Sequence, residues 1–114
     1  MSLGSLLAEQ LEWTRDWTLK LLSDVNGDDW LFQPAPGLAH PLWLCGHLAV
    51  AQDLLVHVRC LNKSVLPDAF AAHFPNGAPV KSGDEHDYPS APEVQRVMAD
   101  MHAKTLAAVR DMSD

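Results

Sequence analysis

The stretch "HPLWLCGHLAVAQDLLVH", residues 40–57, decides how this chain is expected to fold. Its apolar residues recur at helical spacing, a series that continues just beyond it, at Leu44, Leu48, Ala51, Leu55 and Val58. His47 lies three residues after Leu44 and four before Ala51, so the same helical face carries an imidazole. A desolvated imidazole needs a partner for each nitrogen that does not face water. The pattern therefore predicts a helix with His47 in its core-facing stripe, as a hydrogen-bonded core residue or as a ligand.

Two more segments show helical periodicity. Residues 5–25 place one apolar face at Leu7, Leu11, Thr14, Thr18 and Leu21, with Trp17 beside it. A third helix is expected over residues 90–112, because Ser90 and Glu93 form a capping box at its start. Its stripe is Val94, Val97, Met98, Met101, Thr105, Ala108 and Met112. With the middle helix at residues 41–62, where Pro41 suits the first turn, the fold class is all-α in a single domain.

The remaining segments are expected to be irregular. Residues 63–89 carry proline, glycine and asparagine turn signals without a sustained period, which predicts a long loop. We expect its Phe70, Phe74 and Tyr88 to fold over one end of the helices. The opening "MSLGS" is given no structural role.

Composition and charge limit the classes of function. Eight Lys and Arg stand against fifteen Asp and Glu, for a net charge of -7, and the basic residues are scattered, which argues against a nucleic-acid partner. No apolar run approaches the roughly 20 residues of a membrane span. Cys45 and Cys60 are too far apart along one helix to pair, so a reducing cytoplasm is the expected location.

The histidines hold no self-contained metal motif, because no two of the six are three or four residues apart. His40 precedes Pro41 and is expected near the helix N-cap. His57 follows Asp53 by four residues, a spacing that favours a solvated ion pair. The two cysteines have no nearby base, and burial is the expected fate of both.

The other three histidines are expected to be surface residues. His73 and His86 belong to the long loop, and His102 borders the apolar stripe of the third helix without lying on it. His86 and His102 are kept as minor candidates for metal ligands beside His47.

A longer stretch, "FQPAPGLAHPLWLCGHLAVAQD" at residues 32–53, resembles the second-helix region of the DinB/YfiT-like superfamily of metalloenzymes. The shared series is a proline-rich turn, then Trp43, then "GHLA" at residues 46–49; "FPNGAP" and "YPSAPEV" resemble the loop and third helix that follow. The resemblance implies an up-and-down four-helix bundle with a divalent ion, zinc or nickel, held by three histidines near one end. His47 corresponds to the one that the second helix supplies.

The chain departs from that pattern at its end. The resemblance places the other two ligands in an H-x-x-x-H pair on a fourth helix, and this sequence stops after the third helix with no such pair. We therefore expect the N-terminal part of a longer domain, or a remnant that has lost the site, and no fully ligated ion in this chain.

Two functions remain open. One is a metal-dependent enzyme of thiol-dependent transferase or hydrolase type, acting on a small-molecule substrate, with His47 as its one metal ligand in this chain. The other is a non-catalytic helical interaction module that forms a homodimer. The expected seam of that homodimer comprises Leu7, Leu11, Leu44, Leu55, Val97, Met101 and Met112.

Overall fold

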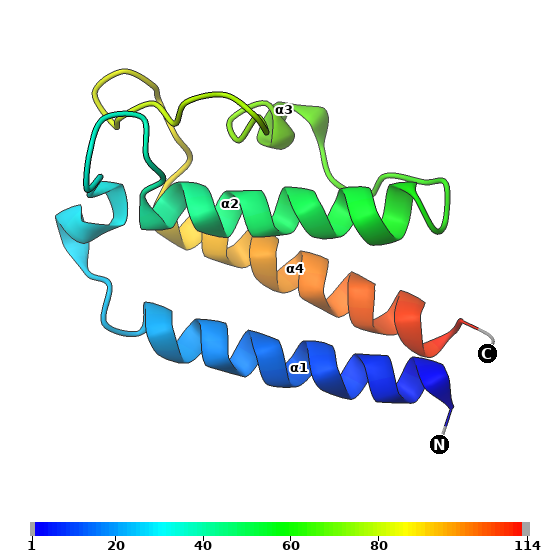
Figure 1. The fold of residues 1–114 in the computed structure, drawn as a ribbon. Helices are drawn as coiled ribbons and strands as arrows, with labels where there is room; N and C mark the ends of the chain where they lie inside the picture. Colours follow the sequence, from blue (N-terminus) through cyan, green and yellow to red (C-terminus); the bar gives the residue numbers. More distant parts are fainter. Residues whose placement is uncertain (1, 113–114) are drawn as a thin grey trace.

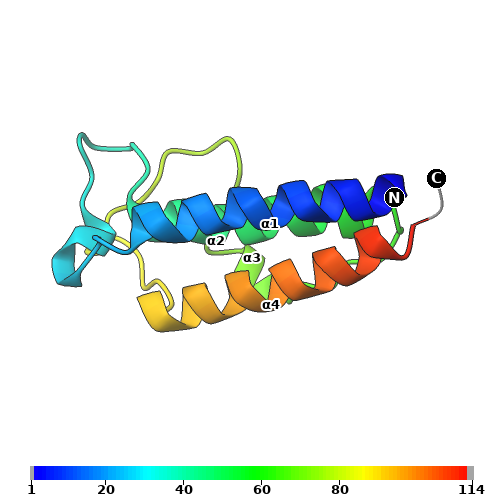
Figure 2. The same ribbon diagram turned by 90° about the horizontal axis from the view of Figure 1, so that it is seen from below.

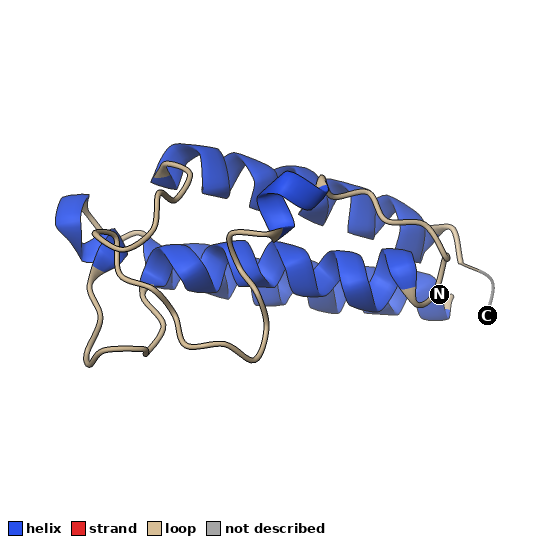
Figure 3. Cartoon of the chain, turned by 90° about the horizontal axis from the view of Figure 1, so that it is seen from above, coloured by secondary structure: helices blue, strands red, loops and turns tan. Residues whose placement is uncertain are grey.

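The computed structural model describes residues 2–112. Three long helices dominate it: α1 (Leu3–Leu22), α2 (Pro41–Gln52) and α4 (Ala91–Arg110). Shorter segments join them, namely the 3-10 helix η1 (Gly27–Leu31), the π-helix η2 (Asp53–Val58) and α3 (Asp68–Ala71). Figure 3 shows helices and loops throughout, and residues 2–112 contain no strand, so the all-α class is confirmed.

Side-chain caps explain where the long helices begin. The Ser2 hydroxyl accepts from the backbone N–H of Ser5, and the Ser90 hydroxyl accepts from that of Glu93. Setting aside the opening residues was therefore wrong for Ser2, because its cap starts α1 at Leu3 rather than at residue 5. His40 caps α2, as its place before Pro41 predicted.

The three long helices are unequally packed. α4 packs against both α2 and α1, whereas α1 and α2 have no extensive contact with each other within residues 2–112. Figures 1 and 2 together show α4 to one side of the plane that contains α1 and α2. α2 and α4 run in the same direction and α1 runs opposite to both, because the segment carrying α3 returns the chain before α4 starts (Figure 1). No helix of residues 2–112 covers the side opposite α4.

The hydrophobic core lies between α2, α4 and the segment that carries α3. Its buried members are Leu42, Cys45, Ala49, Leu66, Phe70, Phe74, Val94, Met98 and Met101. Phe74 is wholly buried, and its ring lies where a Cβ at position 46 would be, so Gly46 permits this contact. The long loop predicted at residues 63–89 thus supplies two core aromatics and contains a short helix that the sequence pattern did not reveal.

Helix α1 contributes little to this core. Only Gly4 and Ala8 are buried among its 20 residues. A Cβ at Gly4 would meet the Val109 carbonyl, so glycine lets α1 approach the end of α4 there. The Arg15 guanidinium donates to the Met98 carbonyl, and an exposed ion pair joins Arg110 to Glu12.

The apolar stripes predicted for the first two helices are largely exposed. Leu44 and Leu48 of α2 are 49% and 43% exposed, and Leu55 of η2 is 53% exposed. The packed face of α2 is instead formed by Leu42, Cys45, Gly46 and Ala49. We give the name open face to a set of exposed apolar residues of α1, α2 and η2: Leu3, Leu7, Trp17, Leu21, Leu44, Leu48 and Leu55. The expectation that Leu44, Leu48 and Leu55 face the core of the chain was therefore wrong.

The π-helical segment overturns another expectation. Asp53 and His57 are both buried, and each bonds to residues outside this segment instead of forming the predicted solvated ion pair. The Asp53 carboxylate accepts from the Ser64 hydroxyl at 2.6 Å and the Val65 N–H at 2.8 Å. His57 Nε2 lies 3.3 Å from the Thr105 hydroxyl. Asp53 therefore connects η2 to the loop that follows it, and His57 connects η2 to α4.

Candidate functional site

His47 lies beside the open face of α2. Its ring is half-buried and stacks on Trp43, with centroids 4.7 Å apart and planes 10° from parallel. Its Nδ1 atom is buried and has no hydrogen-bond partner in the part of the chain that the structure describes. The ring is thus less buried than predicted, and that nitrogen lacks the partner expected of a core histidine. A buried imidazole nitrogen without a partner lowers the stability of the fold. His47 therefore differs from a histidine whose role is only to stabilise the core.

A groove separates α1 from α2. Leu11, Thr14 and Thr18 form its α1 wall, and Leu48 and Gln52 form its α2 wall. Met98 and His102 of α4 form the floor of this groove, whose volume is about 90 Å³. The groove is lined by the stripes that periodicity marked as core on both helices, so it has the chemistry of a bundle interior.

His102 is half-buried in this groove, not exposed as predicted. Burial lowers the pKa of His102, and the nearby Arg15 guanidinium lowers it further, against the smaller opposing effects of Glu12 and Asp16. A neutral imidazole is therefore favoured at the groove floor.

The structure does not bring the three candidate ligands together. His47 stacks on Trp43, His102 lies in the groove, and His86 belongs to a separate cluster in the loop. Across residues 2–112, no three His, Cys, Asp or Glu side chains lie close enough together to hold one ion. Of the ligands that the family resemblance implies, these residues supply only His47.

The loop before α4 contains a cluster of aromatic and imidazole side chains that sequence spacing did not predict. His73 Nδ1 lies 2.8 Å from His86 Nε2, and the His86 ring packs against Tyr88 with centroids 4.5 Å apart. Both histidines are half-buried rather than simple surface residues. Since 13 positions of irregular chain separate them, no helical period could have indicated their contact.

His40 joins this loop to α2. It is fully buried, and its Nδ1 accepts from the Trp43 N–H, so its Nε2 carries the proton and donates to the Lys81 carbonyl at 3.2 Å. The Tyr88 hydroxyl donates to the same carbonyl at 2.7 Å. Burial lowers the pKa of His40, and the bond to Lys81 only partly opposes that effect.

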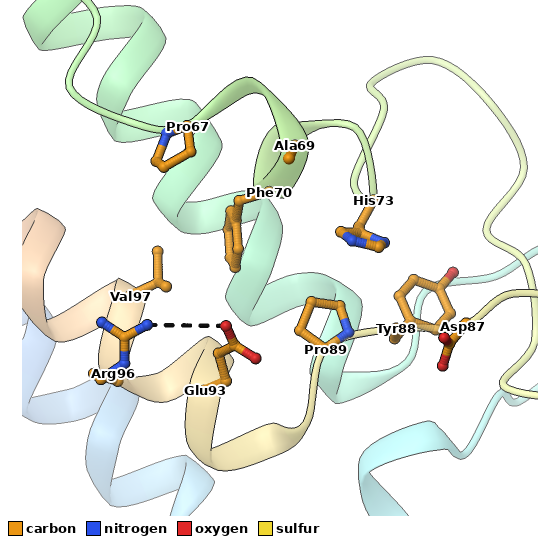
Figure 4. Close-up of a pocket in the computed structure, with 10 residues that line it drawn as sticks. All are labelled: Pro67, Ala69, Phe70, His73, Asp87, Tyr88, Pro89, Glu93, Arg96 and Val97. Atoms are coloured by element: carbon orange, nitrogen blue, oxygen red, sulfur yellow. Dashed lines mark ion pairs between the residues drawn. The ribbon is translucent and has the colours of Figure 1, made fainter.

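A cavity of about 440 Å³ lies between α3, the loop and α4 (Figure 4). Phe70 and Val97 give it an apolar side, while His73, Asp87 and Tyr88 line the part nearest the loop. An ion pair between Glu93 and Arg96, drawn as a dashed line in Figure 4, is exposed and contributes little stability.

The two cysteines lie in different environments. Burial raises the pKa of Cys45 to about 11, so its thiol stays protonated near neutral pH. Cys60 is exposed, contrary to expectation, and its thiol donates to the Leu55 carbonyl. As the sequence predicted, the two do not form a disulfide.

Comparison with known proteins adds one finding. A family model described as the DinB superfamily matches residues 10–114. No curated protein and no solved structure matches the chain. Among the described residues, none of the helices combines the length and apolar character that crossing a bilayer requires.

Proposed function

We propose a function from one established fact, that the chain belongs to the DinB superfamily. The proposed function is a metal-dependent enzyme of thiol-dependent transferase or hydrolase type, with His47 as one metal ligand. The observation that carries the proposal is the buried Nδ1 of His47, which has no protein partner within residues 2–112. Stacking on Trp43 fixes the plane of the ring and limits its rotation. The ring of His47 is thus oriented without using Nδ1 in a hydrogen bond, as expected for a nitrogen that binds a metal ion.

The described residues fit the implied ion only in part, because no second ligand lies beside His47. We infer that the missing ligands come from a helix that packs in the groove between α1 and α2. Leu44 and Ala51, the helical neighbours of His47, lie on the side of α2 that such a helix would cover. A divalent ion with an open position lowers the pKa of a bound water or thiol toward neutrality.

A helical peptide supplied in trans tests this proposal. The peptide is amphipathic and carries two histidines one turn apart, and its control has alanine at both positions. We expect Zn²⁺ to tighten binding of the histidine peptide at least tenfold, measured by calorimetry, and to leave the control peptide unaffected. His47→Ala should abolish the zinc effect, while the matched variant His102→Ala should retain most of it. Zinc-independent binding, or an unchanged zinc effect in His47→Ala, would contradict the proposal.

A second candidate function, a homodimeric interaction module, is favoured by the open face. Its seven residues are each between 42% and 72% exposed. At roughly 200 Å² per large side chain, they expose on the order of 700 Å², close to the roughly 800 Å² per partner of a standard interface. A second copy of the chain offers the same apolar surface in return, which is what a two-fold interface requires.

Analytical ultracentrifugation separates the two candidates. The interaction module predicts a dimer at micromolar concentration that dissociates in the double variant Leu44→Glu, Leu55→Glu. Phe32→Glu, which changes an exposed aromatic residue outside the open face, should remain dimeric. Because each chain carries a charge of -7, added salt should strengthen association. A folded monomer of 12.5 kDa at all concentrations would exclude the dimer.

A further inference from the structure

We propose that His73 and His86 form a two-imidazole binding site for a borderline divalent transition-metal ion, separate from His47. The observation is the distance of 2.8 Å between His73 Nδ1 and His86 Nε2. Two nitrogens that bind one Zn²⁺ at about 2.0–2.1 Å lie roughly 2.9–3.4 Å apart, for angles between 90° and tetrahedral. To share an ion, the two nitrogens must separate by a few tenths of an ångström and the rings must turn until both lone pairs point at the ion, which then replaces the hydrogen bond between the two nitrogens.

The backbone holds both imidazoles in place before any ion binds. His73 follows α3, its N–H donates to the Phe70 carbonyl, and the adjacent Phe74 is fixed in the core. The N–H of His86 donates to the Ser82 carbonyl, and its ring packs on Tyr88. The Tyr88 hydroxyl donates to the Lys81 carbonyl, so the ring against which His86 packs is itself held in place. Such support reduces the entropy lost when an ion binds.

The surroundings leave room for the other ligands of the ion. His73, His86 and Tyr88 all line a cavity of about 210 Å³, which residues 78–81 also line. His73 also lines the larger cavity of Figure 4, together with Asp87. Because no third His, Cys, Asp or Glu among the described residues joins the pair, water or a small anionic ligand from these cavities would complete the coordination.

Charge and ligand type determine which ion the pair accepts. Asp84, Glu85 and Asp87 flank His86 in the sequence, and the whole chain is acidic, so cations are attracted to this loop. Imidazole nitrogens favour Cu²⁺, Ni²⁺ and Zn²⁺, whereas Mg²⁺ and Ca²⁺ prefer oxygen ligands. We expect the affinity to be highest for Cu²⁺ and to be undetectable for Mg²⁺.

Histidine ring NMR of the wild-type chain tests the site without any substitution. On titration with Zn²⁺, we expect the ring signals of His73 and His86 to respond together at one equivalent. Their ¹⁵N shifts should report ligation through Nδ1 of His73 and Nε2 of His86. Ring signals that do not respond, or a response confined to His47 or His102, would overturn the proposal. Since His47 reports separately, the test does not depend on the function proposed for that residue.

Thermal unfolding of matched variants gives a second readout. An ion that joins His73 to His86 stabilises the folded chain, so 1 mM Zn²⁺ should raise the Tm of the wild type. The rise should disappear in His73→Asn and in His86→Gln and persist in His47→Phe and His102→Asn. Should either loop variant fail to fold, the NMR titration of the wild type decides. An equal rise in all variants would show that zinc binds elsewhere and would refute the site.

Discussion

The two sides of α2 differ in what covers them. One side packs against α4 and the segment carrying α3, where Phe74 is wholly buried against Gly46. The other side exposes Leu44 and Leu48 over a groove that α1 borders without closing. Because both sides are apolar, hydrophobicity by itself does not indicate which one the chain buries. Leu42, Cys45 and Ala49 lie on the side that α4 and the segment carrying α3 cover, whereas Leu44 and Leu48 lie on the side that no helix of residues 2–112 covers. Position on the helix, and not the size of the side chain, therefore decides which residues of α2 are buried.

The largest expected effect comes from the packed side. Phe74→Ala should lower the free energy of unfolding by about 3–5 kcal/mol, because it removes a large buried ring and leaves a cavity. Urea unfolding followed by circular dichroism measures the change. The matched variant Phe32→Ala alters an exposed ring and should change stability by about 0.5 kcal/mol or less. Comparable losses in both variants would show that Phe74 is not a central core residue.

A smaller loss is expected when the close contact at Gly46 is altered. Gly46→Ala should cost about 1–3 kcal/mol, because the added methyl overlaps the Phe74 ring and forces it to move. The double variant Gly46→Ala, Phe74→Leu should lose less than the sum of its single variants, since the smaller side chain makes room. Strictly additive losses in urea unfolding would indicate that the two residues do not compete for space.

Two histidines on consecutive segments should respond in opposite directions. His57→Phe should destabilise the chain by about 1–3 kcal/mol, because it removes the buried hydrogen bond to Thr105. His47→Phe keeps an aromatic ring on Trp43 and removes a buried nitrogen without a partner, so it should stabilise by about 1 kcal/mol. A loss in both variants would indicate that His47 serves the fold and would weaken its assignment as a ligand.

Protonation of His40 should make the stability of the chain depend on pH. Because burial lowers its pKa in the folded chain below the ordinary 6.5, the unfolded chain binds this proton at higher pH. The stability linked to His40 is therefore complete above pH 6.5 and is lost as the pH falls toward the folded pKa. Protonation also removes the acceptor that caps α2.

We expect Tm to fall on acidification from pH 7 to about pH 5, and the fall to be smaller in His40→Asn, which keeps a capping side chain. His102 adds dependence of the same sign, because its pKa is also lowered. The difference between wild type and His40→Asn isolates the effect of His40. Parallel pH profiles would contradict this assignment.

Much of the fold could be predicted from local patterns, and the side chains that meet across the loop could not. The capping residues His40 and Ser90 and the stripe of α4 lie where the sequence placed them, because caps and periodicity depend on near neighbours. The stripe on α2 was identified correctly as apolar and assigned to the wrong environment, since periodicity cannot show whether a covering helix is present. The contact of His73 with His86 depends on tertiary packing, which irregular sequence does not encode locally.

Hydrogen exchange measures whether the side of α1 and α2 opposite α4 lacks a covering element. In dilute solution we expect amides of α1 to exchange much faster than those of α4, because only Gly4 and Ala8 of α1 are buried. Their protection should rise with protein concentration, or when a helical peptide fills the groove. Protection of α1 equal to that of α4 in a dilute monomer, unchanged by concentration or peptide, would contradict the account.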